Sequence, residues 1–274
     1  MRAREAYYAC VDFVDDCIGE LLAGLENAGA LDNTIVIYTS DHGDMAGEHG
    51  TWGKCVPYDG SVGVPLLISG PGVKPGHHRA SQVFSLMDLF ATTCRLADLP
   101  IPNDLDSIDQ CDVLANPIGS DAPRAFAPST YLPYAIRAAG AWGLPDDVSA
   151  CAMRALCGRD WKYVEIEGAD PLLFDKRNDP GETTNLAPDP EYARQCERLR
   201  RETMDGFDWS AVREQLAADR QRIEQFASGV KPTTPNQYML PDGRIFDAEA
   251  ALYDARWLHL PPVQGGGIIP QQFG

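Results

Sequence analysis

Residues 39–54 read TSDHGDMAGEHGTWGK and carry the most informative pattern in the chain. They follow the apolar run TIVIYT at 34–39, which lacks polar alternation and is typical of a strand buried on both faces, as in a parallel sheet flanked by helices. In open α/β sheets, ligands bind outside the carboxyl ends of the strands. We therefore expect the polar residues of this segment to lie at a ligand-binding edge.

The flanking residues extend the α/β pattern. Upstream, apolar positions recur every three or four residues over 5–27, which predicts one face of a long helix (Val11, Val14, Ile18, Leu21 and Leu25). Downstream, VPLLISGPG at 64–72 predicts a second strand. A helix that leads into a buried strand predicts an α/β domain.

The chain is expected to have four parts. They are an α/β domain, an irregular connection, a small antiparallel sheet subdomain with helices, and an extended tail, at residues 1–102, 103–150, 151–227 and 228–274. The connection is rich in Pro, Gly, Asp and Ala and shows no sustained periodicity. The subdomain has strand patterns at 152–156, 161–166 and 172–175.

Composition excludes some functions. With 23 basic and 40 acidic residues, the 274-residue chain has a net charge of −17 and no basic cluster, which argues against a nucleic-acid partner. No window is apolar enough for a membrane span, and the first twenty residues lack the apolar core of a signal peptide. The eight cysteines form no CxxC pair, so we expect reduced thiols and a cytoplasmic location.

Two neighbours in the opening segment are candidate metal ligands. Asp41 and His42 stand at a strand end, where a curled backbone lets a carboxylate oxygen and an imidazole nitrogen reach one ion. Lys54 is a cation within range of an anion held there. Ordinary turn chemistry after a strand is the alternative reading of the same residues.

The same segment, with its flanks, resembles the carboxy-terminal metal-binding segment of the sulfatase family, in the choline-sulfatase and iduronate-sulfatase-like branch of the alkaline phosphatase superfamily. The likeness extends over about residues 5 to 200, through SLMDLFATTCRLADLPIP at 85–102 and WKYVEIEGADPLLFDKRNDPGETTNLA at 161–187. It implies an alkaline-phosphatase-like, mainly parallel sheet flanked by helices, a small antiparallel subdomain after it, and hydrolysis of small-molecule sulfate esters.

The resemblance also implies residue roles. Asp41 and His42 match the family's late ligands for a divalent cation, usually calcium or magnesium. Because histidine is an unusual ligand for calcium, magnesium or manganese stays open. Lys54 matches a lysine that contacts the sulfate group. His49 falls beside the pocket and is a candidate substrate contact, although a loop histidine is more often structural.

The departures concern the nucleophile. Sulfatases use a formylglycine made from the cysteine of a Cys-x-Pro-x-Arg motif, with an early Asp-Asp pair beside it. Only Cys55 is followed by proline two positions on, and Asp59 stands where arginine is required. The likeness thus covers a carboxy-terminal half, and we expect the isolated chain to be inactive, and to self-associate or to pair with the missing half.

Three functions stay open at this stage. The chain is a sulfatase that is truncated or completed by another chain, a phosphonate or phosphate monoester hydrolase of the same superfamily, or a non-catalytic fragment or binding module. In the irregular connection, four aromatic and basic residues are pocket candidates, with surface or core placement as the alternative: Tyr131, Tyr134, Arg137 and Trp142.

Overall fold

The computed structural model describes residues 2–133, 152–229, 237–239 and 245–247. The chain divides into two units, Met1–Trp209 and Ser210–Gly274. Helices and 3-10 turns of the described residues are α1 (Arg2–Asn27), η1 (Leu31–Asn33), η2 (Glu48–Gly50), α2 (Asp59–Val62), α3 (Asp88–Leu96), α4 (Cys111–Ala115), η3 (Pro190–Tyr192), α6 (Ala193–Met204) and α7 (Trp209–Gly229). Their strands are β1 (Val36–Thr39), β2 (Leu66–Ser69), β3 (Phe126–Tyr131), β4 (Met153–Gly158), β5 (Trp161–Ile166), β6 (Leu172–Asp175), β7 (Gln237–Met239) and β8 (Ile245–Asp247).

The first strand pair corrects the expected strand direction. β1 and β2 are antiparallel, with Val36 opposite Ser69 and Thr39 opposite Leu66. A parallel pair needs a crossover connection, usually through a helix, whereas the segment between these strands contains only η2 and the short α2. Tyr38 is 38% exposed, so the expectation that this strand is buried on both faces is also wrong for the described residues.

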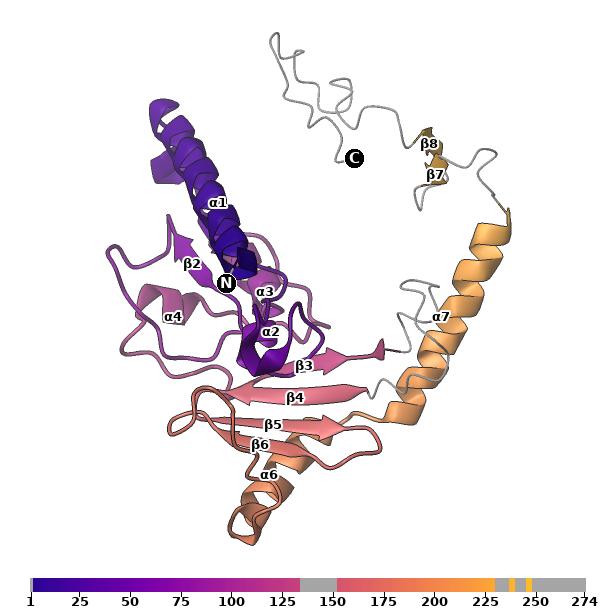
Figure 1. The fold of residues 1–274 in the computed structure, drawn as a ribbon. Coiled ribbons are helices and arrows are strands. Elements are labelled where there is room, and N and C mark those ends of the chain that lie inside the picture. Colours follow the sequence, from indigo (N-terminus) through magenta and orange to yellow (C-terminus); the bar gives the residue numbers. More distant parts are fainter. Residues whose placement is uncertain (1, 134–151, 230–236, 240–244, 248–274) are drawn as a thin grey trace. The chain divides into compact units, whose positions relative to one another are not determined.

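A four-stranded antiparallel sheet forms the second half of the first unit, in the order β3-β4-β5-β6 (Figure 1). The three strands predicted at 152–156, 161–166 and 172–175 are confirmed as β4, β5 and β6. β3 and α4 lie in the segment expected to be irregular, which is a correction. The β3 sequence FAPSTY contains a proline and gives little hydrophobic alternation, but an edge strand tolerates proline.

The core of this unit lies between one face of the sheet and α6. Side chains alternate along the strands, so Leu156, Tyr163 and Leu173 point to the same face and meet Leu199 of α6 there. Tyr163, Leu173 and Leu199 are each 0% exposed. Burial of these large apolar side chains stabilises the packing of α6 on this face of the sheet.

The opposite face of the sheet carries smaller and more polar side chains. Ser129 is paired with Ala155, and Cys157 with Lys162, across neighbouring strands. This face lines the cavity described below, so the sheet connects the core to the candidate site.

Helix α1 confirms the predicted first helix, but its side chains are largely exposed. Val11, Val14 and Leu21, which belong to the predicted apolar face, are 46%, 45% and 63% exposed. Among the described helices, none combines the length and the apolar character that a bilayer crossing requires.

The second unit contains α7 beyond its first residue and a β7–β8 hairpin. Gln237 pairs with Asp247, and Met239 with Ile245, in antiparallel register. The extended tail expected over 228–274 stays a prediction, because apart from the end of α7 and these two strands it lies outside the described residues.

Candidate active site

The chain leaves β1 through Ser40 and reaches the two candidate metal ligands. The His42 amide donates to Asp41 Oδ1 at 2.9 Å, and the Ser40 hydroxyl donates to the His42 carbonyl oxygen at 2.8 Å. The first of these bonds favours the carboxylate form and lowers the pKa of Asp41 below its ordinary value. Asp41 is thus an anion at neutral pH, with Oδ2 left for another partner.

The imidazole of His42 directs its Nε2 atom toward the Asp41 carboxylate. Its Nδ1 lies 2.9 Å from the Gly43 carbonyl oxygen. Because a carbonyl only accepts, Nδ1 is the donor in this contact, which leaves Nε2 as the ring nitrogen that a cation can bind. Nε2 lies 3.4 Å from Asp41 Oδ2, so these two atoms are close enough to share one cation.

Gly43 fixes the backbone that carries these ligands. Its amide donates to the Ser61 carbonyl oxygen of α2 at 2.8 Å. A Cβ atom at this position would overlap the Gly60 carbonyl oxygen and lie 2.9 Å from that of Gly63. Glycine is therefore required here for close backbone approach, as the Asp-His-Gly order suggests.

Asp44 stabilises the loop that follows the ligand pair and leads to Lys54. Its Oδ1 accepts hydrogen bonds from the Ala46 amide at 2.7 Å and the Gly53 amide at 3.2 Å. The Met45 amide also donates to the Gly53 carbonyl oxygen at 2.8 Å. These bonds close the loop directly before Lys54, which returns the lysine to the ligand pair.

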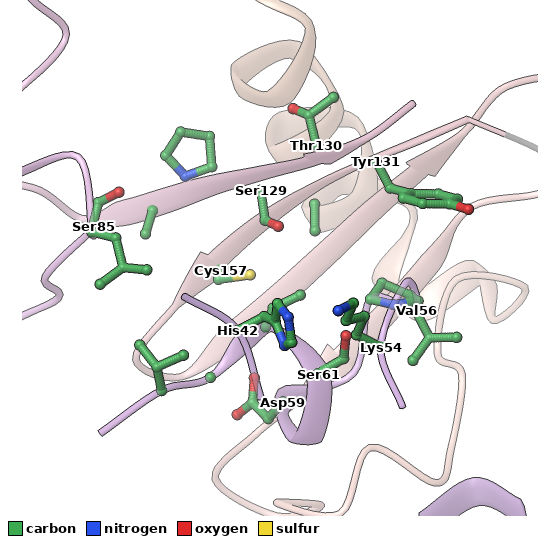
Figure 2. Close-up of a pocket in the computed structure, with 18 of the residues that line it drawn as sticks. His42, Lys54, Val56, Asp59, Ser61, Ser85, Ser129, Thr130, Tyr131 and Cys157 are labelled. Atoms are coloured by element: carbon green, nitrogen blue, oxygen red, sulfur yellow. The ribbon is translucent and has the colours of Figure 1, made fainter. Parts of the chain in front are cut away.

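One cavity of about 700 Å³ holds all three groups, because Asp41, His42 and Lys54 line it together. Figure 2 shows the His42 and Lys54 side chains projecting into the same space, with Ser129 projecting toward them from β3. Among the residues that the structure describes, no carboxylate forms an ion pair with Lys54. The cavity thus combines two candidate cation ligands with a lysine available to an anion.

The remaining sequence candidates lie in different places. The His49 ring stacks on Tyr58, with centroids 3.9 Å apart and an interplanar angle of 9°, and it is absent from the described lining of the cavity. Tyr131 does line the cavity. Tyr134, Arg137 and Trp142 lie outside the described residues. A substrate contact by His49 stays a prediction, and its stacking on Tyr58 favours a structural role instead.

Sequence reasoning missed the charged wall of the cavity. Asp59 and Lys176 line it, with Lys176 Nζ 2.6 Å from Asp59 Oδ2. Burial alone would raise the pKa of Asp59, but Lys162 and Lys176 hold it below its ordinary value. The signal in the sequence was the single lysine in the apolar strand WKYVEI, which a purely hydrophobic reading passes over.

The donor atoms fit one of the two groups that the family resemblance implies, the divalent cation. Asp41 Oδ2 and His42 Nε2 fit two positions in the shell of a divalent cation, leaving the others to water or further ligands. No cluster of three or more His, Cys, Asp or Glu side chains suited to a metal occurs in the described part of the chain. Formylglycine does not fit, because Asp59 at the required arginine position is paired with Lys162.

A carboxylate, an imidazole and a lysine around one cavity beyond a strand end is the arrangement expected of alkaline-phosphatase-like hydrolases, and solved structures agree with this class. One is the structure of BT4656 in complex with its substrate D-glucosamine-2-N,6-O-disulfate, at 27% identity and a TM-score of 0.60, covering 76% of this chain and 40% of that one. Another is the phosphonate monoester hydrolase of Agrobacterium radiobacter, at 28% identity and a TM-score of 0.58, covering 89% of this chain and 45% of that one.

The family follows from the sequence comparisons. Residues 2–99 match the sulfatase family model, and the chain belongs to the sulfatase family. Arylsulfatase K of Xenopus laevis is 33% identical over 210 residues, which are 74% of this chain and 37% of the relative. Choline-sulfatase of Rhizobium meliloti is 33% identical over 189 residues, which are 69% of this chain and 34% of the relative. The chain spans about a third of the length of these curated relatives.

Proposed function

We propose that the cavity lined by Asp41, His42 and Lys54 is the cation and sulfate site of a metal-dependent sulfuric ester hydrolase. The observation that carries this proposal is the 3.4 Å separation of the open Asp41 and His42 donor atoms in a cavity that Lys54 also enters. Membership of the sulfatase family, which generally uses a divalent cation, supports the assignment. Calcium is the proposed cation, with magnesium or manganese as the alternatives that the imidazole ligand leaves open.

Asp41, His42 and Lys54 each have a defined role in this proposed site. A divalent cation supplies polarisation of the sulfate oxygens when it is bound. Asp41 and His42 hold that charge at the strand end, and Lys54 neutralises negative charge on the sulfate group or on its bridging oxygen. The small side chains of Ser129 and Ala155 leave room over the sheet for the alcohol part of the ester.

The attacking group is the component that these residues do not supply. Since the only cysteine followed by proline two positions on has Asp59 in place of arginine, we derive no covalent step from this chain. We propose that the isolated chain binds sulfate esters weakly and hydrolyses them negligibly. Activity would then require a polypeptide bearing a Cys-x-Pro-x-Arg motif and an Asp-Asp pair, and the nucleotide sequence upstream would show whether the same gene encodes it.

Calcium titration calorimetry and an arylsulfate assay at saturating calcium test both parts. Asp41→Ala is the test variant, and Asp12→Ala, at an exposed position on α1, is the matched control. We expect calcium binding to be lost only in Asp41→Ala, and equal binding in both variants would contradict the site. We expect no turnover above the buffer rate, and turnover that disappears in Asp41→Ala would contradict the claim of inactivity.

A second candidate is hydrolysis of phosphonate or phosphate monoesters. It is favoured by the likeness to the phosphonate monoester hydrolase, because a cation pair and a lysine do not by themselves distinguish sulfur from phosphorus. Competition between an aryl sulfate and an aryl phosphonate monoester for the calcium-loaded chain separates the two. Tighter binding of the phosphonate would favour this candidate, and binding of neither would favour a non-catalytic module.

A further inference from the structure

A lysine is completely buried beside the candidate site. Lys162 of β5 is 0% exposed. Its ammonium nitrogen lies 3.0 Å from the Pro57 carbonyl oxygen, 2.5 Å from Asp59 Oδ1 and 2.5 Å from Glu182 Oε1. Lysine is almost never fully buried unless it is paired, so these three contacts satisfy a charge that would otherwise be very costly.

The contacts of Lys162 belong to a closed network. Glu182 Oε2 accepts a hydrogen bond from the Asp59 amide at 2.7 Å, and Lys176 Nζ reaches Asp59 Oδ2 at 2.6 Å. Two ammonium groups and two carboxylates thus balance one another. Lys162 comes from β5, Lys176 from the turn directly after β6 and Glu182 from the loop that follows. The network therefore joins these elements to the first residue of α2.

The other end of α2 supports the metal segment. The Asp59 carbonyl oxygen accepts from the Gly63 amide at 2.8 Å, which closes the turn of α2. The Ser61 carbonyl oxygen accepts from the Gly43 amide, and no side chain fits between Gly43 and the α2 backbone. Gly43 directly follows Asp41 and His42. A displacement of α2 would therefore move the backbone that orients both candidate ligands.

We propose that Lys162 is a positioning residue for the cation site, holding α2 through Asp59 and Glu182 so that the segment 41–43 keeps its place. Removal of one partner destabilises any buried ion pair, so the positioning role is distinguished by a local effect at Gly43 that removal of a matched buried cation elsewhere does not produce. The expected effect on cation affinity rests on the proposed function. The expected effect on the packing of Gly43 against Ser61 does not depend on it.

Hydrogen exchange of the Gly43 amide, measured without metal, tests the structural part. The test variant is Lys162→Met, which keeps the length of the side chain and removes the charge. The matched control is Arg124→Met, because Arg124 is also a cation paired with a buried carboxylate, Asp88, at 2.7 Å. Asp88 is the first residue of α3 and Arg124 lies in the segment before β3, and the hydrogen bonds of Arg124 among the described residues do not reach α2.

We expect Lys162→Met to accelerate exchange at Gly43 at least tenfold relative to an α6 amide in the same sample, and Arg124→Met to leave that ratio unchanged. Unchanged exchange at Gly43 in Lys162→Met, or the same acceleration in both variants, would overturn the proposal. Should Lys162→Met fail to fold, Glu182→Gln takes its place, since it retains the shape and the hydrogen bond to the Asp59 amide. The same outcomes then decide.

A manganese titration separates this proposal from the function. We expect at least tenfold weaker manganese binding in Lys162→Met and wild-type affinity in Arg124→Met. If the wild-type chain binds neither manganese nor calcium, the proposed cation site is wrong, while the exchange result still decides whether Lys162 positions the segment 41–43. Equal manganese affinity in wild type and Lys162→Met would contradict the positioning role.

Discussion

Substitution of Gly43 by alanine should disrupt the packing on which the candidate site depends. An added Cβ atom would overlap the Gly60 carbonyl oxygen and lie 2.9 Å from the Gly63 carbonyl oxygen. Both obstacles are backbone atoms, so no change of side-chain rotamer relieves them. The segment must move away from α2, and the 2.8 Å bond from the Gly43 amide to Ser61 is lost or lengthened.

The size of the effect follows from these two terms. A lost hydrogen bond costs about 1 kcal/mol, with more if the amide stays buried and unpaired. Overpacking of a closely packed site costs about 1–3 kcal/mol. Together they give a decrease of about 2–4 kcal/mol in the free energy of unfolding, and a domain of this size loses roughly 2–4 °C in Tm per kcal/mol. Differential scanning calorimetry should therefore show a Tm about 10 °C lower.

Gly50→Ala provides the matched control. Gly50 has a φ of +72° but no atom within 4 Å of the added Cβ, so only the left-handed backbone conformation is penalised. This costs about 1–2 kcal/mol for an alanine. A loss in Gly43→Ala no larger than that in Gly50→Ala would refute the explanation by close approach to α2.

Three further outcomes are expected. Burial would raise the pKa of Asp88, but Arg124 and backbone amides hold this pKa below the ordinary value of 3.8. The ionised Asp88 therefore contributes fully to stability above about pH 4, and this contribution is lost as the pH falls below that value. Arg124→Met should thus cost about 3–5 kcal/mol in urea unfolding at pH 7 and less at pH 2.5, and an equal loss at both would contradict the pairing. The chain should associate in sedimentation velocity through the exposed apolar face of α1, and the double variant Val14→Glu, Leu21→Glu should be monomeric; a monodisperse wild-type monomer would count against this. Leu199→Ala should lower the free energy of unfolding by about 2–5 kcal/mol, since Leu199 is 0% exposed in the core, and a loss below 1 kcal/mol would show that α6 is not part of it.

Local patterns in the sequence predicted the elements whose stability is local. β4, β5 and β6 are joined by short turns, and the order Asp-His-Gly at a strand end placed Asp41 and His42 where the structure has them. Lys54 could be linked to the same site by its short separation from them in the sequence and by the family resemblance, whereas the hydrogen bonds of Asp44 that close the loop before it are seen only in the structure.

The features that could not be predicted depend on pairing between distant segments. The direction of β1 relative to β2 is set by the connection between them, which hydrophobicity does not report. β3 is identified by its partner β4 rather than by its own composition. The burial of Lys162 depends on Asp59 and Glu182, which are distant from it in sequence and become neighbours only in the folded chain.

The cation site itself can be tested most directly by anomalous diffraction from crystals soaked in manganese. We predict one strong anomalous peak within bonding distance of both Asp41 Oδ2 and His42 Nε2, on the side of the cavity that Lys54 enters. A map with no peak between these two atoms, or with manganese held only at other carboxylates, would contradict the assignment of this cavity.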